Sequence, residues 1–194
     1  MTCASILALL VVTGRAGGQI VTLGPPPPKT ALEAFELQEG ATIVHGLSRI
    51  GEVVGPQGGA VVVIAREMTN AVTGRKARGV TIEVHERDST PRYSTSYIDY
   101  DELAGLIQGL EQLGRLNRSS TQLDQFGGDY RTKGHFRVAV RGFRSDISVA
   151  LSSGLVDPTS ATFKATDLGK IRDLLVAAVV KLDALGAPGT TPPD

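Results

Sequence analysis

The chain has 194 residues, and its 20 basic side chains are matched by 20 acidic ones. This balance excludes a dedicated nucleic-acid binder and a polybasic membrane protein, because both classes need a large surplus of Lys and Arg. The single Cys excludes an internal disulfide framework and a thiolate metal cluster. The 23 Gly and 10 Pro are typical of a protein with many turns and therefore with much β structure.

The N-terminal segment 1–18 has the pattern of an export signal. Residues 4–12 are an unbroken apolar run, which is too short to span a bilayer because spanning takes about 20 apolar residues. Ala16, Gly17 and Gly18 supply the small residues that a signal peptidase requires. We therefore predict a signal peptide over 1–18 and an exported protein, periplasmic or secreted, with no transmembrane segment in the mature chain. The alternative is a buried N-terminal helix in a cytoplasmic scaffold.

Proline-rich segments flank the region that we expect to fold. Residues 19–29 contain four consecutive prolines, which favour an extended polyproline II conformation and suit a linker. A proline-motif ligand for a partner is the alternative. Residues 186–194 contain little that can be buried, and we predict a disordered tail. The folded region then covers residues 30–185.

Apolar residues alternate with polar ones in three segments, which predicts β-strands with one face on the core and the other facing water. The connections are short, so the strands should pair as antiparallel hairpins. The apolar positions are Val80, Ile82 and Val84, then Phe136, Val138 and Val140, then Ile147, Val149 and Leu151.

Two segments carry apolar residues at a spacing of three and four, which predicts amphipathic helices. The first stripe is Leu103, Leu106, Leu110 and Leu113, and the second is Leu168, Ile171, Leu175 and Ala178, continuing to Leu182 and Leu185. We expect Asp101 and Thr166 to be the N-caps of the two helices, because both side chains can accept a free backbone N–H.

The two stripes are related by one constant offset along the chain, and the same offset relates Ile82 to Ile147. Further upstream, Leu32-Glu33-Ala34-Phe35 matches Leu123-Asp124-Gln125-Phe126. We interpret these matches as an internal duplication of a strands-then-helix unit, with pseudo-repeats over 30–118 and 119–185. The predicted fold is a single α+β domain in two layers, an antiparallel β-sheet shared by both halves with two amphipathic helices on one face. Two separate small domains are the alternative.

Two groups of side chains are candidate binding residues. Tyr93, Tyr97 and Asp99 share one face of an extended strand, and an exposed tyrosine row suits a sugar, peptide or protein partner. Basic residues at two hairpin turns could together hold an anionic ligand. They are Arg75 and Lys76, with Arg78, at the first turn and Arg141 and Arg144 at the second.

No arrangement of residues identifies a catalytic or metal site. His45, His85 and His135 belong to no ligand pair with a recognised spacing, and alternation places His85 and His135 on the water-facing side of strands. Asp99 and Asp101 lie close in sequence and could serve an enzyme together with a histidine. We assign no catalytic residue, no metal ligand and no cofactor.

Several segments resemble a family of exported bacterial proteins of unassigned activity. The resemblance covers about residues 30–185 and implies a bacterial exported protein, with no catalytic or cofactor residue to transfer. It rests on Thr30-Ala31-Leu32-Glu33-Ala34-Phe35, Ser96-Tyr97-Ile98-Asp99-Tyr100-Asp101-Glu102-Leu103, Tyr130-Arg131-Thr132-Lys133-Gly134 and Lys181-Leu182-Asp183.

The sequence therefore predicts an exported, non-enzymatic domain that binds a protein partner or a small ligand in the cell envelope. The alternative is an exported hydrolase or metal-dependent enzyme that uses His85 or His135 with Asp99 or Asp101. The two hypotheses differ in whether these side chains converge in space. Composition leaves the oligomeric state open.

Overall fold

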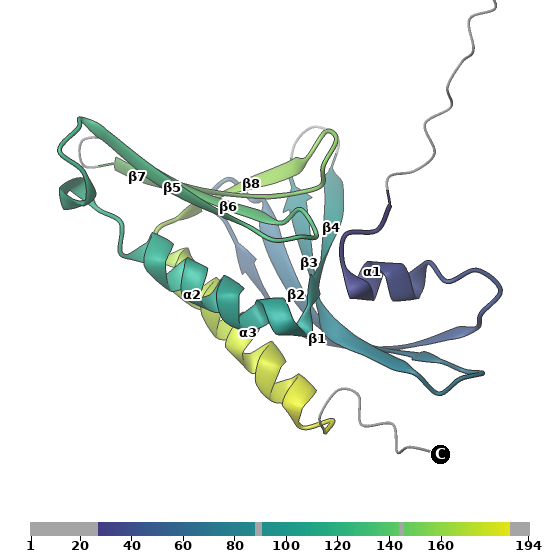
Figure 1. The fold of residues 1–194 in the computed structure, drawn as a ribbon. Helices are drawn as coiled ribbons and strands as arrows, with labels where there is room; N and C mark the ends of the chain where they lie inside the picture. The colour runs from purple at the N-terminus through teal and green to yellow at the C-terminus, as the bar shows by residue number, and fades with distance from the viewer. Residues whose placement is uncertain (1–26, 88–90, 144–145, 187–194) are drawn as a thin grey trace, which may run out of the picture.

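The computed structural model describes residues 27–87, 91–143 and 146–186. The predicted signal peptide, most of the predicted linker, residues 187–194 of the predicted tail and Arg144 lie outside these residues. The described chain begins with a short helix and continues as strands and longer helices (Figure 1). The elements are α1 (Ala31–Glu36), β1 (Ile43–Val54), β2 (Ala60–Asn70), β3 (Lys76–Glu86), β4 (Arg92–Asp99), η1 (Tyr100–Glu102), α2 (Leu103–Gly114), η2 (Arg118–Ser120), β5 (Gln125–Arg131), β6 (Arg137–Phe143), β7 (Asp146–Ser153), β8 (Thr159–Lys164) and α3 (Asp167–Asp183).

The strands form two antiparallel sheets of four strands each, sheet A in the order β1-β2-β3-β4 and sheet B in the order β5-β6-β7-β8. The prediction of antiparallel hairpins in an α+β fold is confirmed. The prediction of one shared sheet is wrong, because the hydrogen-bonded ladder of sheet A ends at β4 and sheet B has a ladder of its own. The two sheets are nevertheless in contact, since β3 and β4 lie against β7 and β8.

Each long helix packs on the sheet that it does not directly follow. α2 comes after β4 but contacts β5 and β6, whereas α3 comes after β8 and contacts β1 and β2. The two helices also pack against each other. The apolar stripes predicted from the sequence face inward, although Leu185 at the end of the second stripe is 47% exposed.

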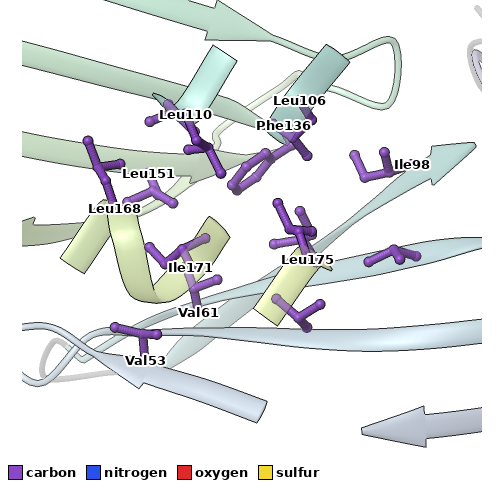
Figure 2. Close-up of a cluster of buried hydrophobic side chains, with 14 of the residues drawn as sticks. Val53, Val61, Ile98, Leu106, Leu110, Phe136, Leu151, Leu168, Ile171 and Leu175 are labelled. Carbon is purple, nitrogen blue, oxygen red and sulfur yellow. The ribbon is translucent and has the colours of Figure 1, made fainter. Parts of the chain in front are cut away.

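One hydrophobic cluster joins both sheets and both long helices. Figure 2 shows Leu106 and Leu110 of α2 near Phe136, and Ile171 of α3 near Val61 of β2. All five side chains are 1% exposed or less. A core drawn from both sheets explains why neither half needs a complete core of its own.

A second, smaller cluster lies on the opposite face of sheet A, where α1 covers the sheet. It consists of Leu32 and Phe35 of α1 with Met68 of β2. Thr30 caps α1, since its Oγ1 accepts a hydrogen bond from the Glu33 backbone at 3.0 Å. The sequence match between residues 32–35 and 123–126 therefore does not extend to structure. Residues 123–126 lead into β5 instead of a helix, and Gly127 and Gly128 follow at once, which disfavours a helix.

Of the two predicted N-caps, Thr166 is confirmed in position and Asp101 is wrong, since Glu102 is the N-cap of α2. Asp101 lies inside η1, and Thr166 occupies the N-cap position of α3 without a capping hydrogen bond from its side chain. Asp167, the first residue of α3, accepts hydrogen bonds from Lys170 Nζ at 2.8 Å and from the backbone N–H of Lys164, which precedes the helix, at 3.0 Å. The hydrogen bond from Lys170 is the main reason why the pKa of Asp167 falls below its ordinary value.

Candidate functional site

The predicted tyrosine row is only partly exposed, because α1 covers one end of β4. Tyr93 is 67% exposed, whereas Asp99 is 9% exposed. The Asp99 carboxylate accepts hydrogen bonds from the backbone N–H groups of Ala31 and Leu32, both at 2.9 Å. Asp99 therefore holds the first turn of α1, where a negative charge is favourable, and is not available to a ligand.

Tyr97 belongs to the same covered end of β4. Its ring lies 5.6 Å from the Arg66 guanidinium carbon and packs against the cluster under α1. Burial, followed by a hydrogen bond with Glu36, raises the pKa of Tyr97 to about 12. Only Tyr93 remains open to solvent, where it stacks on the His85 ring with the ring centres 5.4 Å apart. The expectation that Tyr93 and Tyr97 form one exposed surface is wrong.

The first basic turn is occupied by internal contacts. Lys76 Nζ and Arg78 Nε donate to the Glu67 carboxylate at 3.0 and 2.6 Å, and Arg78 also donates to the backbone carbonyls of Leu185 and Gly186. The Arg78 side chain is 6% exposed. It satisfies carbonyl groups at the C-terminal end of α3, where a positive charge is favourable. Arg75 lies at the exposed end of the same hairpin.

The two basic turns do not come together. Figure 1 places the β2–β3 hairpin and the β6–β7 end of sheet B at opposite ends of the molecule. Arg141 lies on β6 rather than in a turn, and Arg144 lies outside the described residues. The prediction that both turns hold a single anion is therefore wrong.

The residues named for an enzyme do not converge either. No hydrogen bond or ion pair joins any two of His85, His135, Asp99 and Asp101, all of which the structure describes. Lys133 Nζ lies 3.8 Å from the Asp101 carboxylate, and His85 Nε2 lies 3.1 Å from the Glu83 carboxylate. Within 27–87, 91–143 and 146–186, no group of three His, Cys, Asp or Glu side chains is arranged to hold a metal ion.

A different set of basic residues converges at the end of sheet B that lies near β4. The turn from β5 to β6 and the turn from β7 to β8 meet there around a pocket of about 200 Å³. Arg131 and Arg137 come from directly paired positions of β5 and β6, and His135 comes from the turn between them. The other lining residues are Thr132, Phe136, Ser152, Gly154, Leu155 and Pro158.

Local hydrogen bonds fix the turn that carries His135. Thr132 Oγ1 accepts a hydrogen bond from the Phe136 backbone at 3.1 Å, and the Thr132 backbone N–H donates to the Phe136 carbonyl at 2.9 Å. His135 has a φ of 64°, which belongs to the left-handed region that few residues other than glycine adopt. His135 therefore lies in a turn, and its predicted place on the water-facing side of a strand is wrong.

The charges at this pocket are not balanced. Arg131 Nε lies 3.4 Å from Asp129 Oδ2, and Arg137 Nε lies 3.6 Å from the same oxygen. Arg137 Nε is buried and has no hydrogen-bond partner among the described residues. One carboxylate thus faces two guanidinium groups, which leaves a positive charge on this pair of arginines. Paired guanidinium groups of this kind suit a carboxylate or phosphate ligand.

Buried serine hydroxyls fasten the pocket to sheet A. Ser153 Oγ of β7 lies 2.7 Å from Ser96 Oγ and 3.3 Å from Ser94 Oγ, both of β4. Ser96 and Ser153 are 1% and 0% exposed. The end of β7 is therefore held against β4 immediately before Gly154, which lines the pocket and has a φ of 104°.

Sequence reasoning missed Arg131 and Arg137, although a signal was present. Val138 and Val140 were assigned to the core face, so alternation already placed Arg137 on the other face with Arg141. What the sequence did not show is that Arg131 pairs directly with Arg137. That register depends on a tight turn whose length is set by the Thr132 hydrogen bonds.

Two other hollows among the described residues are less suited to an anion. A larger one of about 400 Å³ lies between α2 and α3 and is lined by Arg115 and Arg172, but the Arg172 guanidinium is 2.6 Å from Asp173 and 3.6 Å from Glu111. Arg115 is thus its one arginine without an ion pair to a described residue. A third, of about 210 Å³, lies between β1, β2 and the end of α3, and includes the apolar Leu47, Leu182 and Leu185. The basic pocket of Arg131, His135 and Arg137 is therefore the candidate site.

Comparison with known proteins gives no matching protein-family model and no matching curated sequence. Among the described residues, no helix is both long and apolar enough to cross a membrane.

Proposed function

We propose that this protein is an exported, non-enzymatic binding domain of the cell envelope whose basic pocket recognises an anionic ligand. The observation that carries the proposal is the convergence of Arg131, His135 and Arg137 on one pocket, where both guanidinium groups face the same carboxylate, Asp129. The Arg137 side chain is 34% exposed and lines the pocket, so its guanidinium group can meet a carboxylate or phosphate oxygen there. The apolar wall of Leu155 and Pro158 suits the carbon skeleton of an organic anion.

Export is part of the proposal and is supported by the sequence alone. The apolar run of residues 4–12 and the small residues at 16–18 support cleavage after Gly18. Intact mass and cell fraction of the protein from a bacterial host test this part. A mature chain that begins near Gln19 and lies outside the cytoplasm supports export, and a full-length cytoplasmic chain overturns it.

We also propose that the domain of residues 30–185 arose by duplication of a strands-then-helix unit. The order of the elements supports this proposal, because four antiparallel strands and a helix are followed by four more strands and a second helix. The constant offset between the two helix stripes supports it as well. On this proposal the repeats are 30–118 and 119–185, and α1 is an addition to the first.

Calorimetric titration tests anion binding directly. The probes are galacturonate, inorganic phosphate and sulfate at low ionic strength, with glucose as the neutral control. At least one anion should bind, and Arg137→Gln should weaken it by about tenfold, because a charge-assisted hydrogen bond is lost. Arg118→Gln is the control variant, since Arg118 lies on η2 and not at the pocket. Absence of binding by all three anions, or equal affinity of both variants, would overturn the proposal.

A further inference from the structure

The basic pocket opens onto a second feature, the outer face of sheet B, which is the side turned away from the core. Val138, Val140, Val149 and Leu151 point into the core, so the residues between them lie on the outer face. Arg141, Ser148, Ala150, Ser160 and Lys164 on this face are exposed. The pocket is thus the end of an open sheet surface and not an isolated hole.

Besides Arg131 and Arg137 at the pocket, a further row of paired residues with cationic side chains crosses this face. In the row, Arg141 of β6 pairs with Ser148 of β7, which pairs with Lys164 of β8. Both Arg141 and Lys164 are exposed, and neither forms an ion pair with a described residue, although Arg141 Nη1 donates to the Val140 carbonyl at 3.0 Å. Arg137 at the pocket and Arg141 in this row are four positions apart on one strand, so these two cationic positions are separated by about 13 Å.

The surface between the two cationic positions carries small side chains and hydroxyl groups. Its central row runs from Asp129 through Ala139 and Ala150 to Thr162. The adjoining row adds the hydroxyls of Ser152 and Ser160 to the guanidiniums of Arg131 and Arg137. Small side chains leave room for a chain to lie flat on the sheet, and hydroxyls can donate to or accept from the hydroxyls of a sugar.

These three rows favour a glycan over a peptide. A peptide that binds in extended form uses a sheet edge for its backbone and apolar pockets for its side chains. The three rows consist of Gly, Ala, Ser, Thr and charged residues, and they contain no large apolar side chain. Their cations are Arg131, Arg137, Arg141 and Lys164, and their carboxylate is Asp129.

We propose that the outer face of sheet B binds a linear polysaccharide that carries carboxylates. One carboxylate enters the basic pocket at Arg131 and Arg137, and another along the same chain lies against Arg141 and Lys164. The sugar units between them lie over Ala150 and Thr162. This inference rests on the proposed function, because it takes the pocket as one end of the binding surface.

Calorimetry with a length series tests the inference. The probes are galacturonic acid, a homogeneous oligogalacturonate long enough to reach from the pocket to Lys164, neutral dextran and poly-glutamate. The oligomer should bind at least tenfold more tightly than the monomer, because the second contact is intramolecular once the first has formed.

The variants assign that gain to the surface. Arg141→Gln/Lys164→Gln should abolish the gain and leave monomer binding unchanged, whereas Arg137→Gln should weaken both probes about tenfold. Arg49→Gln/Lys181→Gln is the matched control, because it removes the same charge from β1 and from the end of α3. It should bind both probes as the unmodified protein does.

The outcomes separate this inference from the proposed function. If the monomer binds through Arg137 and the oligomer gains nothing, the inference is overturned and the proposed function stands. Equal losses of oligomer affinity in the two double variants show nonspecific attraction and also overturn the inference. Poly-glutamate that binds as tightly as the oligomer, with the same dependence on Arg141 and Lys164, overturns the assignment to a glycan. If neither galacturonate probe, phosphate nor sulfate binds, both proposals fall.

Discussion

Replacing Asp99 with Ala tests whether this residue is a structural anchor rather than part of a binding surface. The change removes the acceptor for two backbone hydrogen bonds at the start of α1, from Ala31 and Leu32. Asp101→Ala is the matched control, because the Asp101 side chain is 76% exposed and its nearest cation is 3.8 Å away.

The expected magnitude follows from what holds α1 on sheet A. Burial of Leu32 and Phe35 contributes about 3–6 kcal/mol. Ordering the six residues of α1 costs about 6–12 kcal/mol in backbone entropy. The apolar contacts alone therefore do not hold the helix, and the two hydrogen bonds to the Asp99 carboxylate, worth about 3–6 kcal/mol, bring the balance close to zero or better. Without them, α1 should leave the sheet while the main core stays folded.

Two assays report this local change. Hydrogen exchange of residues 30–37 should become fast in Asp99→Ala and stay slow in Asp101→Ala. Phenolate absorbance should show that the pKa of Tyr97 moves from about 12 toward the ordinary value of 10, because α1 no longer buries the ring and Glu36 no longer reaches the phenol. Unchanged exchange at residues 30–37, together with an unchanged Tyr97 titration, would refute this explanation.

Three further predictions concern the framework of the site. Ser96→Ala and Ser153→Ala should each lower the free energy of unfolding in urea by about 1–2 kcal/mol, because each leaves a buried hydroxyl without its partner. The double variant should lose clearly less than the sum of the two single losses, and strict additivity would contradict this. Gly109→Ala should destabilise the protein by about 1–3 kcal/mol, since the added Cβ would lie 2.4 Å from the Tyr130 ring. Gly169→Ala has open space and should stabilise the protein by about 0.4–1 kcal/mol. Thermal melts in which Gly109→Ala is the more stable variant would be inconsistent with this packing. Because the pKa of Asp167 is lowered on folding, its contribution to the free energy of unfolding is present above the ordinary pKa of 3.8 and is lost as the pH falls through the lower folded value. The stability of Asp167→Asn should therefore fall less steeply in acid than that of the unmodified protein. Parallel plots of stability against pH for the two proteins would argue against the hydrogen bonds described.

The helices and the strand faces could be predicted from the sequence because each depends on a local period. The stripes of α2 and α3 and the alternating residues of β3, β6 and β7 are buried as expected, apart from the partly buried Ile147 and the exposed Leu185. The division into two sheets could not be predicted, because alternation states which face of a strand is buried but not which strand lies beside it.

The candidate site shows the same limit. Alternation predicts that Tyr97 and Asp99 lie on the water-facing side of β4. In the structure they are covered by α1, which is separated from β4 in the chain by three strands. Arg78 belongs to a basic turn in the sequence, yet it ends against the last carbonyls of α3. Contacts between residues far apart in the sequence thus bury side chains that the local pattern predicts to be exposed, and no local pattern indicates such contacts. Arg131 and Arg137 lie on either side of one short turn, and their pairing followed only once the register was known.

The central claim is that the basic pocket of Arg131, His135 and Arg137 is the binding site. The most direct test is to titrate the isotope-labelled protein with oligogalacturonate and map the NMR shifts of its backbone amides. The account predicts that the largest shifts fall on residues 131–137 and 152–158 and extend to Arg141 and Lys164. In Arg137→Gln, the same shifts should require about tenfold more oligogalacturonate. Shifts that cluster instead between α2 and α3, or around Tyr93 and His85, would contradict it.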